Sequence, residues 1–203
     1  MGKREVNTER GTRNAEKARA VFLDRDGVVS RSLVRNGLPF APTTLNDFEI
    51  LPEASEACQR LKQAGFLLIV VTNQPEVGRG IIKQETVEAM HAKMCRELPI
   101  ARVGVCYHPG HGMSHCDCRK PKTGLLVSAA QELRIDLTQS WMIGDRWRDI
   151  DCGSAAGCRT IFIERGYAEG LKRAPDFRAK DLAEAADLIL AALNKMEQDA
   201  ATR

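Results

Sequence analysis

Short apolar runs alternate with amphipathic stretches along most of the chain. A continuous apolar run rich in β-branched residues is typical of a strand that is covered on both faces. Such runs predict strands at residues 20–23, 66–71, 102–107, 141–143 and 160–163. Apolar positions at helical spacing, several of them bounded by Pro or Gly, predict helices at residues 52–64, 83–98, 125–133 and 182–193. A further helix is predicted after Asp145 and ends at about residue 157.

This order of strands and helices predicts a three-layer α/β fold. Each right-handed crossover places a helix against a parallel sheet, so helices are expected on both of its faces. A chain of 203 residues has the length of one domain, and the segments between strands leave no room for a second folded module. We expect one domain over residues 20–195, with a flexible tail at residues 1–19 and a short tail at residues 196–203.

Composition excludes several classes of protein. Thirty basic residues against 27 acidic ones leave a net charge of +3, which is too small to favour binding of nucleic acid. No apolar run approaches the ~18 residues of a membrane span, and residues 1–19 have no apolar core of a signal peptide. An odd number of cysteines, seven, in a reducing compartment fits buried thiols, metal ligands or a nucleophile, and does not fit a disulfide framework. We therefore expect a cytoplasmic protein, a monomer, with a small-molecule partner and neither nucleic acid nor membrane.

Acidic residues follow two of the predicted strands. Asp24 and Asp26 come directly after residues 20–23, and Asp145 follows residues 141–143. Ligands bind at the carboxyl ends of strands in parallel sheets, and neighbouring carboxylates stay ionised together when a cation neutralises them. These three residues therefore predict a magnesium site. A calcium loop is excluded because Gly27 and Val28 break the pattern of an EF-hand.

Further polar residues fall at the same predicted edge. Thr72 and Asn73 follow the second strand, and Asp149 comes four residues after Asp145. Asp149 has two interpretations: it supports the metal site, or it only sits in the first turn of a helix, where a negative charge is favourable.

A loop rich in Cys and His predicts a zinc site. Its ligands are expected to be Cys106, His108, Cys116 and Cys118. Three thiolates and one imidazole make a closed tetrahedral site, which has a structural role; His111 and His115 are possible substitutes. The alternatives are a reduced loop without metal and a nucleic-acid finger, but no basic recognition helix follows. A zinc ion here would order the segment that carries Arg119 and Lys120.

Four segments in order resemble the motifs of haloacid-dehalogenase-type (HAD) phosphatases. They are FLDRDG at residues 22–27, VTN at 71–73, RKP at 119–121 and IGD at 143–145. The resemblance spans about residues 20–163. It implies a Rossmann-like fold and hydrolysis through an aspartyl-phosphate.

The same resemblance implies a role for each matching residue. Asp24 would attack phosphorus, and Asp26 would protonate the leaving oxygen and then activate water. Thr72 and Lys120 would hold the phosphoryl oxygens, while Asp145 would complete the magnesium site with the two other acids.

The arrangement of the zinc loop directly before RKP narrows the resemblance to subclass IIIA. This subclass includes the heptose bisphosphate phosphatases and the histidinol-phosphate phosphatases, which are small and lack a cap. The first kind implies removal of the C7 phosphate of a heptose 1,7-bisphosphate in bacterial cell-surface precursor synthesis. Substrate binding would then involve Asn73, Arg119 and Arg146, with Arg79 as a further possible cation. Histidinol phosphate and nucleic-acid 3′-phosphates are alternative substrates, and a non-catalytic, zinc-ordered binding module is the alternative outside enzymes.

Two segments depart from the typical heptose enzymes. Residues 28–48 form a longer segment, so its substrate contacts are not mapped residue by residue. Pro75 stands where Ser is more usual, which removes a hydroxyl and a backbone donor near the expected sugar.

Overall fold

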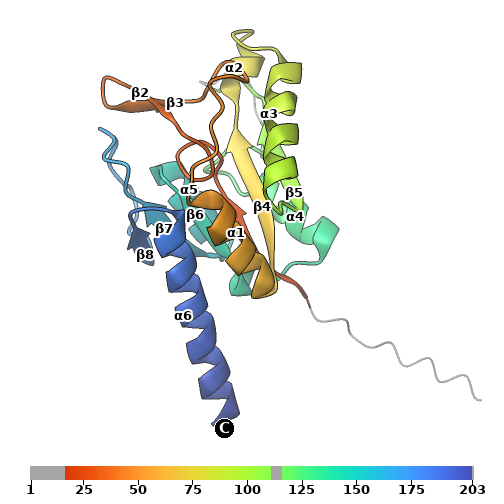
Figure 1. The fold of residues 1–203 in the computed structure, drawn as a ribbon, viewed down its shortest axis with the longest axis vertical. Helices are drawn as coiled ribbons and strands as arrows, with labels where there is room; N and C mark the ends of the chain where they lie inside the picture. Colours follow the sequence, from red (N-terminus) through yellow and green to blue (C-terminus); the bar gives the residue numbers. More distant parts are fainter. Residues whose placement is uncertain (1–16, 111–115, 203) are drawn as a thin grey trace, which may run out of the picture.

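A six-stranded parallel sheet forms the centre of the molecule in the computed structural model, which describes residues 17–110 and 116–202 (Figure 1). The strand order is β5-β4-β1-β6-β7-β8. The strands are β1 Arg19–Leu23, β4 Phe66–Asn73, β5 Arg102–Cys106, β6 Trp141–Gly144, β7 Arg159–Ile163 and β8 Phe177–Ala179. Residues 1–16 of the expected N-terminal tail and the substitute ligands His111 and His115 lie outside the described residues.

The register of the sheet brings the ends of its central strands together. In β1, Leu23 lies opposite Val70 of β4 and Ile143 of β6. The residues that follow these three therefore meet at one edge. Figure 1 shows β4 pointing toward the end of the molecule where α2 and the β2–β3 hairpin lie.

Helices cover both faces of this sheet. They are α1 Ala54–Gln63, α2 Pro75–Gly78, α3 Gln84–Glu97, α4 Gly124–Leu133, α5 Trp147–Ala155 and α6 Leu182–Ala201, with a 3-10 turn at Leu137–Gln139. Residues of α1, α3 and α6 pack in one apolar cluster, and residues of α4 and α5 pack in a second. The expected three-layer α/β fold is thus confirmed.

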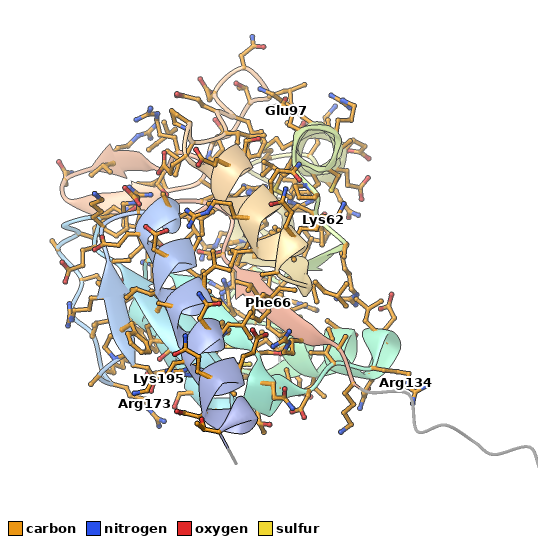
Figure 2. The ribbon with its side chains drawn as sticks, turned by 60° about the horizontal axis from the view of Figure 1, so that its bottom comes forward. Lys62, Phe66, Glu97, Arg134, Arg173 and Lys195 are labelled. Atoms are coloured by element: carbon orange, nitrogen blue, oxygen red, sulfur yellow. The ribbon has the colours of Figure 1, made fainter. Side chains whose placement is uncertain are left out.

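Alternation along β1 explains the two clusters. Val21 and Leu23 face the cluster with α1, α3 and α6, whereas Ala20 and Phe22 face the other. Successive side chains of a strand point to opposite faces, so a strand that is apolar throughout is buried on both. Figure 2 turns the opposite end of the molecule forward and labels Phe66, where β4 begins.

A hairpin occupies part of the long segment 28–48. Strands β2, Leu33–Arg35, and β3, Leu38–Phe40, pair antiparallel around Asn36 and Gly37, which have φ values of 51° and 74°. An Asn-Gly pair favours this two-residue turn because both central positions require positive φ.

The structure differs from the predicted elements at both ends of the chain. Arg19, expected in the tail, begins β1, and the last helix continues to Ala201 instead of ending at residue 193. The apolar periodicity stops near Leu193, but the following polar residues favour a helix and include no Gly or Pro. Among residues 17–110 and 116–202, no helix is both long and apolar enough to cross a membrane.

Candidate active site

Lys120 is buried at the carboxyl edge of the sheet between two carboxylates. Its Nζ lies 2.8 Å from Oδ1 of Asp24 and 2.7 Å from Oδ1 of Asp149, and it donates to the carbonyl oxygen of Val71 at 2.7 Å. Burial alone would lower the pKa of Lys120, but the two carboxylates outweigh it and the pKa is raised. Lys120 is therefore a fixed cation.

Asp145 packs against the backbone of Gly27, which has no side chain. A Cβ atom on Gly27 would lie 1.7 Å from Oδ2 of Asp145, and Gly27 has a φ of +92°. Glycine is required there by the close approach and by the positive φ. The turn after β1 and the end of β6 can therefore meet, which brings Asp145 to Asp24.

Three carboxylates form a group suited to a cation. Oxygens of Asp24, Asp145 and Asp149 lie within 4.8 Å of one another, and all three residues are buried. Neither oxygen of Asp145 has a hydrogen-bond partner among the described residues. Buried polar atoms without partners are costly, and an all-oxygen cluster is the donor set that Mg²⁺ prefers. These residues therefore fit a magnesium ion.

The pKa values of these carboxyl groups also favour a bound cation. Burial raises the pKa of Asp24 to about 6, with Lys120 opposing and Asp149 adding to the rise. Burial and the charges of Asp24 and Asp149 raise the pKa of Asp145 well above its usual range. A divalent cation would favour the ionised forms.

Asp26 has a different environment. Its carboxylate accepts hydrogen bonds from Arg25 Nε at 2.9 Å and Nη2 at 2.8 Å, from Ser30 Oγ at 3.0 Å and from Gln74 Nε2 at 2.9 Å. The structure therefore does not bring the Asp26 side chain into the carboxylate group, where the sequence placed it as a magnesium ligand. Asp26 still lines the same cavity as Asp24 and Thr72.

Gln74 and Arg25 hold the polar groups of this cavity in position. Gln74 Nε2 also donates to Thr72 Oγ1 at 2.9 Å, so one amide links Thr72 to Asp26. Arg25 is fully buried, stacks over the Phe48 ring, and its Nη1 lies 3.1 Å from Nε2 of His91. Sequence reasoning missed Arg25, Gln74 and His91; the one local signal was Arg25 between the two acids.

Asn73 contacts the backbone of Lys120. Its Nδ2 donates to the Lys120 carbonyl oxygen, and its Oδ1 accepts from the Lys120 amide, both at 3.1 Å. Both ends of the Asn73 amide are thus used to position Lys120, although Asn73 was expected to bind substrate. That role stays a prediction.

Arginines gather on the rim of the cavity. Arg119, Arg146 and Arg148 all line it, together with Glu76, whose Oε2 is buried without a partner among the described residues. Arg146 makes a two-pronged ion pair with Glu169, at 2.6 and 3.0 Å. Burial and the neighbouring guanidinium of Arg146, with a smaller contribution from Arg119, lower the pKa of Arg148.

Arg79 lies outside this cavity. Its Nε donates to the carbonyl oxygen of Pro109 at 3.0 Å, and it is not among the residues that line the cavity.

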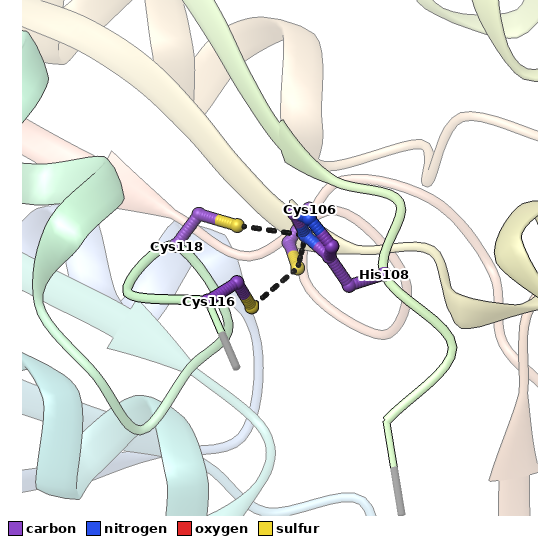
Figure 3. A group of neighbouring side chains, drawn as sticks. All are labelled: Cys106, His108, Cys116 and Cys118. Atoms are coloured by element: carbon purple, nitrogen blue, oxygen red, sulfur yellow. Dashed lines mark hydrogen bonds between the residues drawn. The ribbon is translucent and has the colours of Figure 1, made fainter. Parts of the chain in front are cut away.

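The cysteine loop brings its four expected ligands together (Figure 3). Cys106 Sγ lies 3.9 Å from Cys116 Sγ and 3.5 Å from His108 Nδ1, and Cys118 Sγ lies 3.2 Å from the same nitrogen. A tetrahedral zinc ion with Zn–S and Zn–N bonds of about 2.3 and 2.05 Å requires ligand spacings of about 3.8 and 3.5 Å. The cluster therefore fits zinc, and it directly precedes the segment that places Lys120.

Comparison with known proteins identifies the class. The family model described as HAD-hydrolase-like matches residues 117–185. This match agrees with the parallel fold and the acidic site, which are those of a HAD-like hydrolase.

Individual relatives narrow the assignment. The D-glycero-β-D-manno-heptose-1,7-bisphosphate 7-phosphatase of Pseudomonas aeruginosa is 35% identical over 153 residues, which are 72% of this chain and 81% of that protein. The enzyme of the same name from Escherichia coli K12 is 34% identical over 161 residues, 74% of this chain and 81% of that protein. The chain belongs to this family of HAD-like phosphatases.

A solved structure agrees with this family. The D,D-heptose 1,7-bisphosphate phosphatase from B. bronchiseptica, complexed with magnesium and phosphate, has a TM-score of 0.73 and 27% identity. The match covers 86% of this chain and 99% of that one.

Proposed function

We propose that this protein removes the C7 phosphate of D-glycero-β-D-manno-heptose 1,7-bisphosphate, in the synthesis of bacterial cell-surface heptose precursors. The observation that carries the proposal is the buried group of Asp24, Lys120, Asp145 and Asp149 at the carboxyl edge of the sheet, in a chain whose relatives bear this enzyme's name.

The first displacement uses the free oxygen of Asp24. Both hydrogen bonds that Asp24 accepts from described residues, from Lys120 Nζ and the Arg25 amide, end on Oδ1. Oδ2 is then available to bond to phosphorus as the bond from phosphorus to the sugar oxygen breaks. Asp26, in its protonated form, gives its proton to that oxygen, so the sugar leaves with a neutral C7 hydroxyl and keeps its other phosphate.

The second displacement releases phosphate. Asp26, now ionised, takes a proton from a water molecule whose oxygen bonds to phosphorus as the bond to Asp24 breaks. Inorganic phosphate leaves, and both acids return to their starting forms. Arg25 and Gln74 keep the Asp26 carboxylate at the cavity in both steps.

Two metal ions have separate roles in this proposal. Mg²⁺, held by Asp24 and Asp145 with Asp149 beside them, would screen the charge between the nucleophile and the phosphoryl group. Zn²⁺, held by the four-ligand cluster, would order the loop that carries Lys120. Lys120 and the hydroxyl of Thr72 would hold the phosphoryl oxygens.

The test measures phosphate release from heptose 1,7-bisphosphate in the presence of Mg²⁺. Asp24→Asn keeps the Oδ1 acceptor for Lys120 and removes the nucleophile, so kcat should fall by at least about a thousandfold. Asp199→Asn, on the exposed end of α6, is the matched control and should retain full activity. Retained turnover in Asp24→Asn contradicts the assigned nucleophile. A higher kcat/KM of the wild type for histidinol phosphate contradicts the assigned substrate.

The monomeric state, the cytoplasmic location and the division into a domain at residues 20–195 with two tails stay predictions. Gel filtration and limited proteolysis would test the first and the last.

A further inference from the structure

We propose that Arg148, paired with Arg119, is the specificity-determining cation that binds the second phosphate of the substrate, the one that is not hydrolysed. This inference rests on the proposed function. The sequence-based expectation named Arg119 and Arg146 among the substrate-binding residues; the inference keeps Arg119 and puts Arg148 in place of Arg146.

Arg146 is already neutralised within the protein. Its Nε and Nη2 donate to the two oxygens of Glu169, at 2.6 and 3.0 Å. A two-pronged pair between guanidinium and carboxylate uses one whole edge of the guanidinium. The backbone amide of Arg146 in addition donates to Oδ2 of Asp149 at 3.1 Å, which fixes the start of α5. Arg146 thus links α5 to the loop that carries Glu169.

Arg148 has guanidinium N–H groups that donate to no described residue. Its one hydrogen bond to a described residue goes from Nη2 to Glu169 Oε1 at 3.3 Å, and that oxygen already accepts from Arg146 and from Trp147 Nε1 at 2.9 Å. The Nε of Arg148 is buried without a partner in the described part of the chain. Burial of an unpaired charged donor is costly, so this position favours an anion that would complete it.

Arg119 provides the second half of the anion site. Its one hydrogen bond to a described residue is long, 3.5 Å from Nη1 to the carbonyl oxygen of His108. Its guanidinium lies over Gly110, where a Cβ atom would stand 3.1 Å from Cζ. Arg119 and Arg148 line the same cavity as Asp24. Two guanidiniums on one cavity repel each other unless an anion lies between them, and a phosphate accepts from both.

The chemistry required of the ligand follows from this arrangement. One phosphoryl group must reach Asp24 and Lys120, while a second anion contacts the rim. A sugar with phosphates at both ends meets this requirement, whereas a sugar with one phosphate cannot fill both places.

The experiment compares kcat/KM for heptose 1,7-bisphosphate and heptose 7-phosphate in three variants. Arg148→Gln removes the charge and keeps a polar side chain of similar length. Arg148→Lys keeps the charge without the planar fork. Arg96→Gln, exposed on α3, is the matched control.

We expect Arg148→Gln to lower the ratio of the two specificity constants by about 10- to 100-fold, the loss typical of one hydrogen bond to a charged group. Arg148→Lys should fall between Arg148→Gln and the wild type, and Arg96→Gln should keep the wild-type ratio. An equal loss on both substrates means that Arg148 is only structural, and an unchanged ratio means that it does not bind the second phosphate; either result overturns the inference.

The substrate preference of the wild-type enzyme shows whether a negative result overturns the proposed function or only the inference about Arg148. If the wild-type enzyme itself does not prefer the bisphosphate, the proposed substrate is wrong and the inference is overturned with it. If the wild type prefers the bisphosphate and Arg148→Gln keeps that preference, the substrate stands and the inference alone is overturned.

Discussion

Replacement of Gly27 by alanine tests whether the turn after β1 holds the metal site together. The substitution has two separable costs. Alanine at a φ of +92° is strained, by about 1–2 kcal/mol. Its Cβ would also lie 1.7 Å from Oδ2 and 2.6 Å from Cγ of Asp145, so the buried carboxylate must move. Overpacking of this kind costs about 1–3 kcal/mol more.

Gly80 offers a matched control. Its φ is +71°, and a Cβ atom there would have no other atom within 4 Å. Gly80→Ala therefore has the backbone strain without the clash. We expect the free energy of unfolding to fall by about 2–5 kcal/mol in Gly27→Ala and by about 1–2 kcal/mol in Gly80→Ala.

Two measurements check this reasoning. Urea unfolding gives the stability of each variant. The Mg²⁺ concentration for half-maximal activity should rise in Gly27→Ala, because Asp145 is displaced from Asp24, and should stay at the wild-type value in Gly80→Ala. Equal stability losses in the two variants, together with an unchanged Mg²⁺ requirement in Gly27→Ala, would refute the argument that Gly27 is needed for the approach of Asp145.

Two further predictions concern the zinc cluster and the buried histidine. Cys116→Ser should lower the zinc content below one ion per chain and reduce kcat by about 10- to 100-fold through misplacement of Lys120; full zinc retention by elemental analysis would contradict the ligand assignment. Burial and the adjacent Arg25 lower the pKa of His91 to about 4, so the unfolded state binds this proton first and stability is lost as pH falls from about 6.5 toward 4, by up to about 3 kcal/mol. His91→Gln keeps an acceptor for Arg25, and urea unfolding at pH 7 and 4.5 should show a smaller loss than in wild type; an equal loss would exclude His91 as the cause.

The central strands could be predicted because their signal is local. Each of residues 66–71 and 141–143 is an apolar run with polar residues after it, and burial on both faces of a parallel sheet requires that pattern. β8 has no such run: it has only three residues, Phe177–Ala179, and the middle one is an arginine, so the pairing with β7 has no local signal. The β2–β3 hairpin had a local signal, Asn36-Gly37, but its strands are too short to show alternation.

The acidic site was predictable in its residues more than in its contacts. Spacing indicated that Asp24 and Asp26 share a turn, but it could not indicate which carboxylate the buried Arg25 would take. Arg25 pairs with Asp26, and Asp149 joins Asp24 and Asp145. Asp26 also accepts from Gln74, which follows β4 and is 48 positions away in the sequence.

For the arginines on the rim of the cavity, too, the sequence could not indicate the contacts that each makes. Arg146 and Arg148 are two residues apart at the start of α5, and the sequence-based expectation named only Arg146 as a substrate-binding residue. Glu169 decides between them, and it lies 23 residues from Arg146, in the loop after β7. A charge that is free in the sequence is thus neutralised in the fold.

Charge balance explains why an anionic nucleophile can meet an anionic substrate in this cavity. With all groups ionised, the three clustered carboxylates and Lys120 carry a formal charge of −2, which one divalent cation neutralises. Without the cation, the raised pKa values of Asp24 and Asp145 show the cost of keeping these charges together. A bound divalent metal makes the cluster neutral while all three carboxylates stay ionised, and the spare guanidiniums of Arg119 and Arg148 then give the rest of the cavity a positive potential. The metal would screen the phosphoryl group next to Asp24, which both kinds of sugar carry, so loss of the metal should weaken binding of both. Loss of the rim arginines should weaken binding of a doubly phosphorylated sugar more than binding of a singly phosphorylated one.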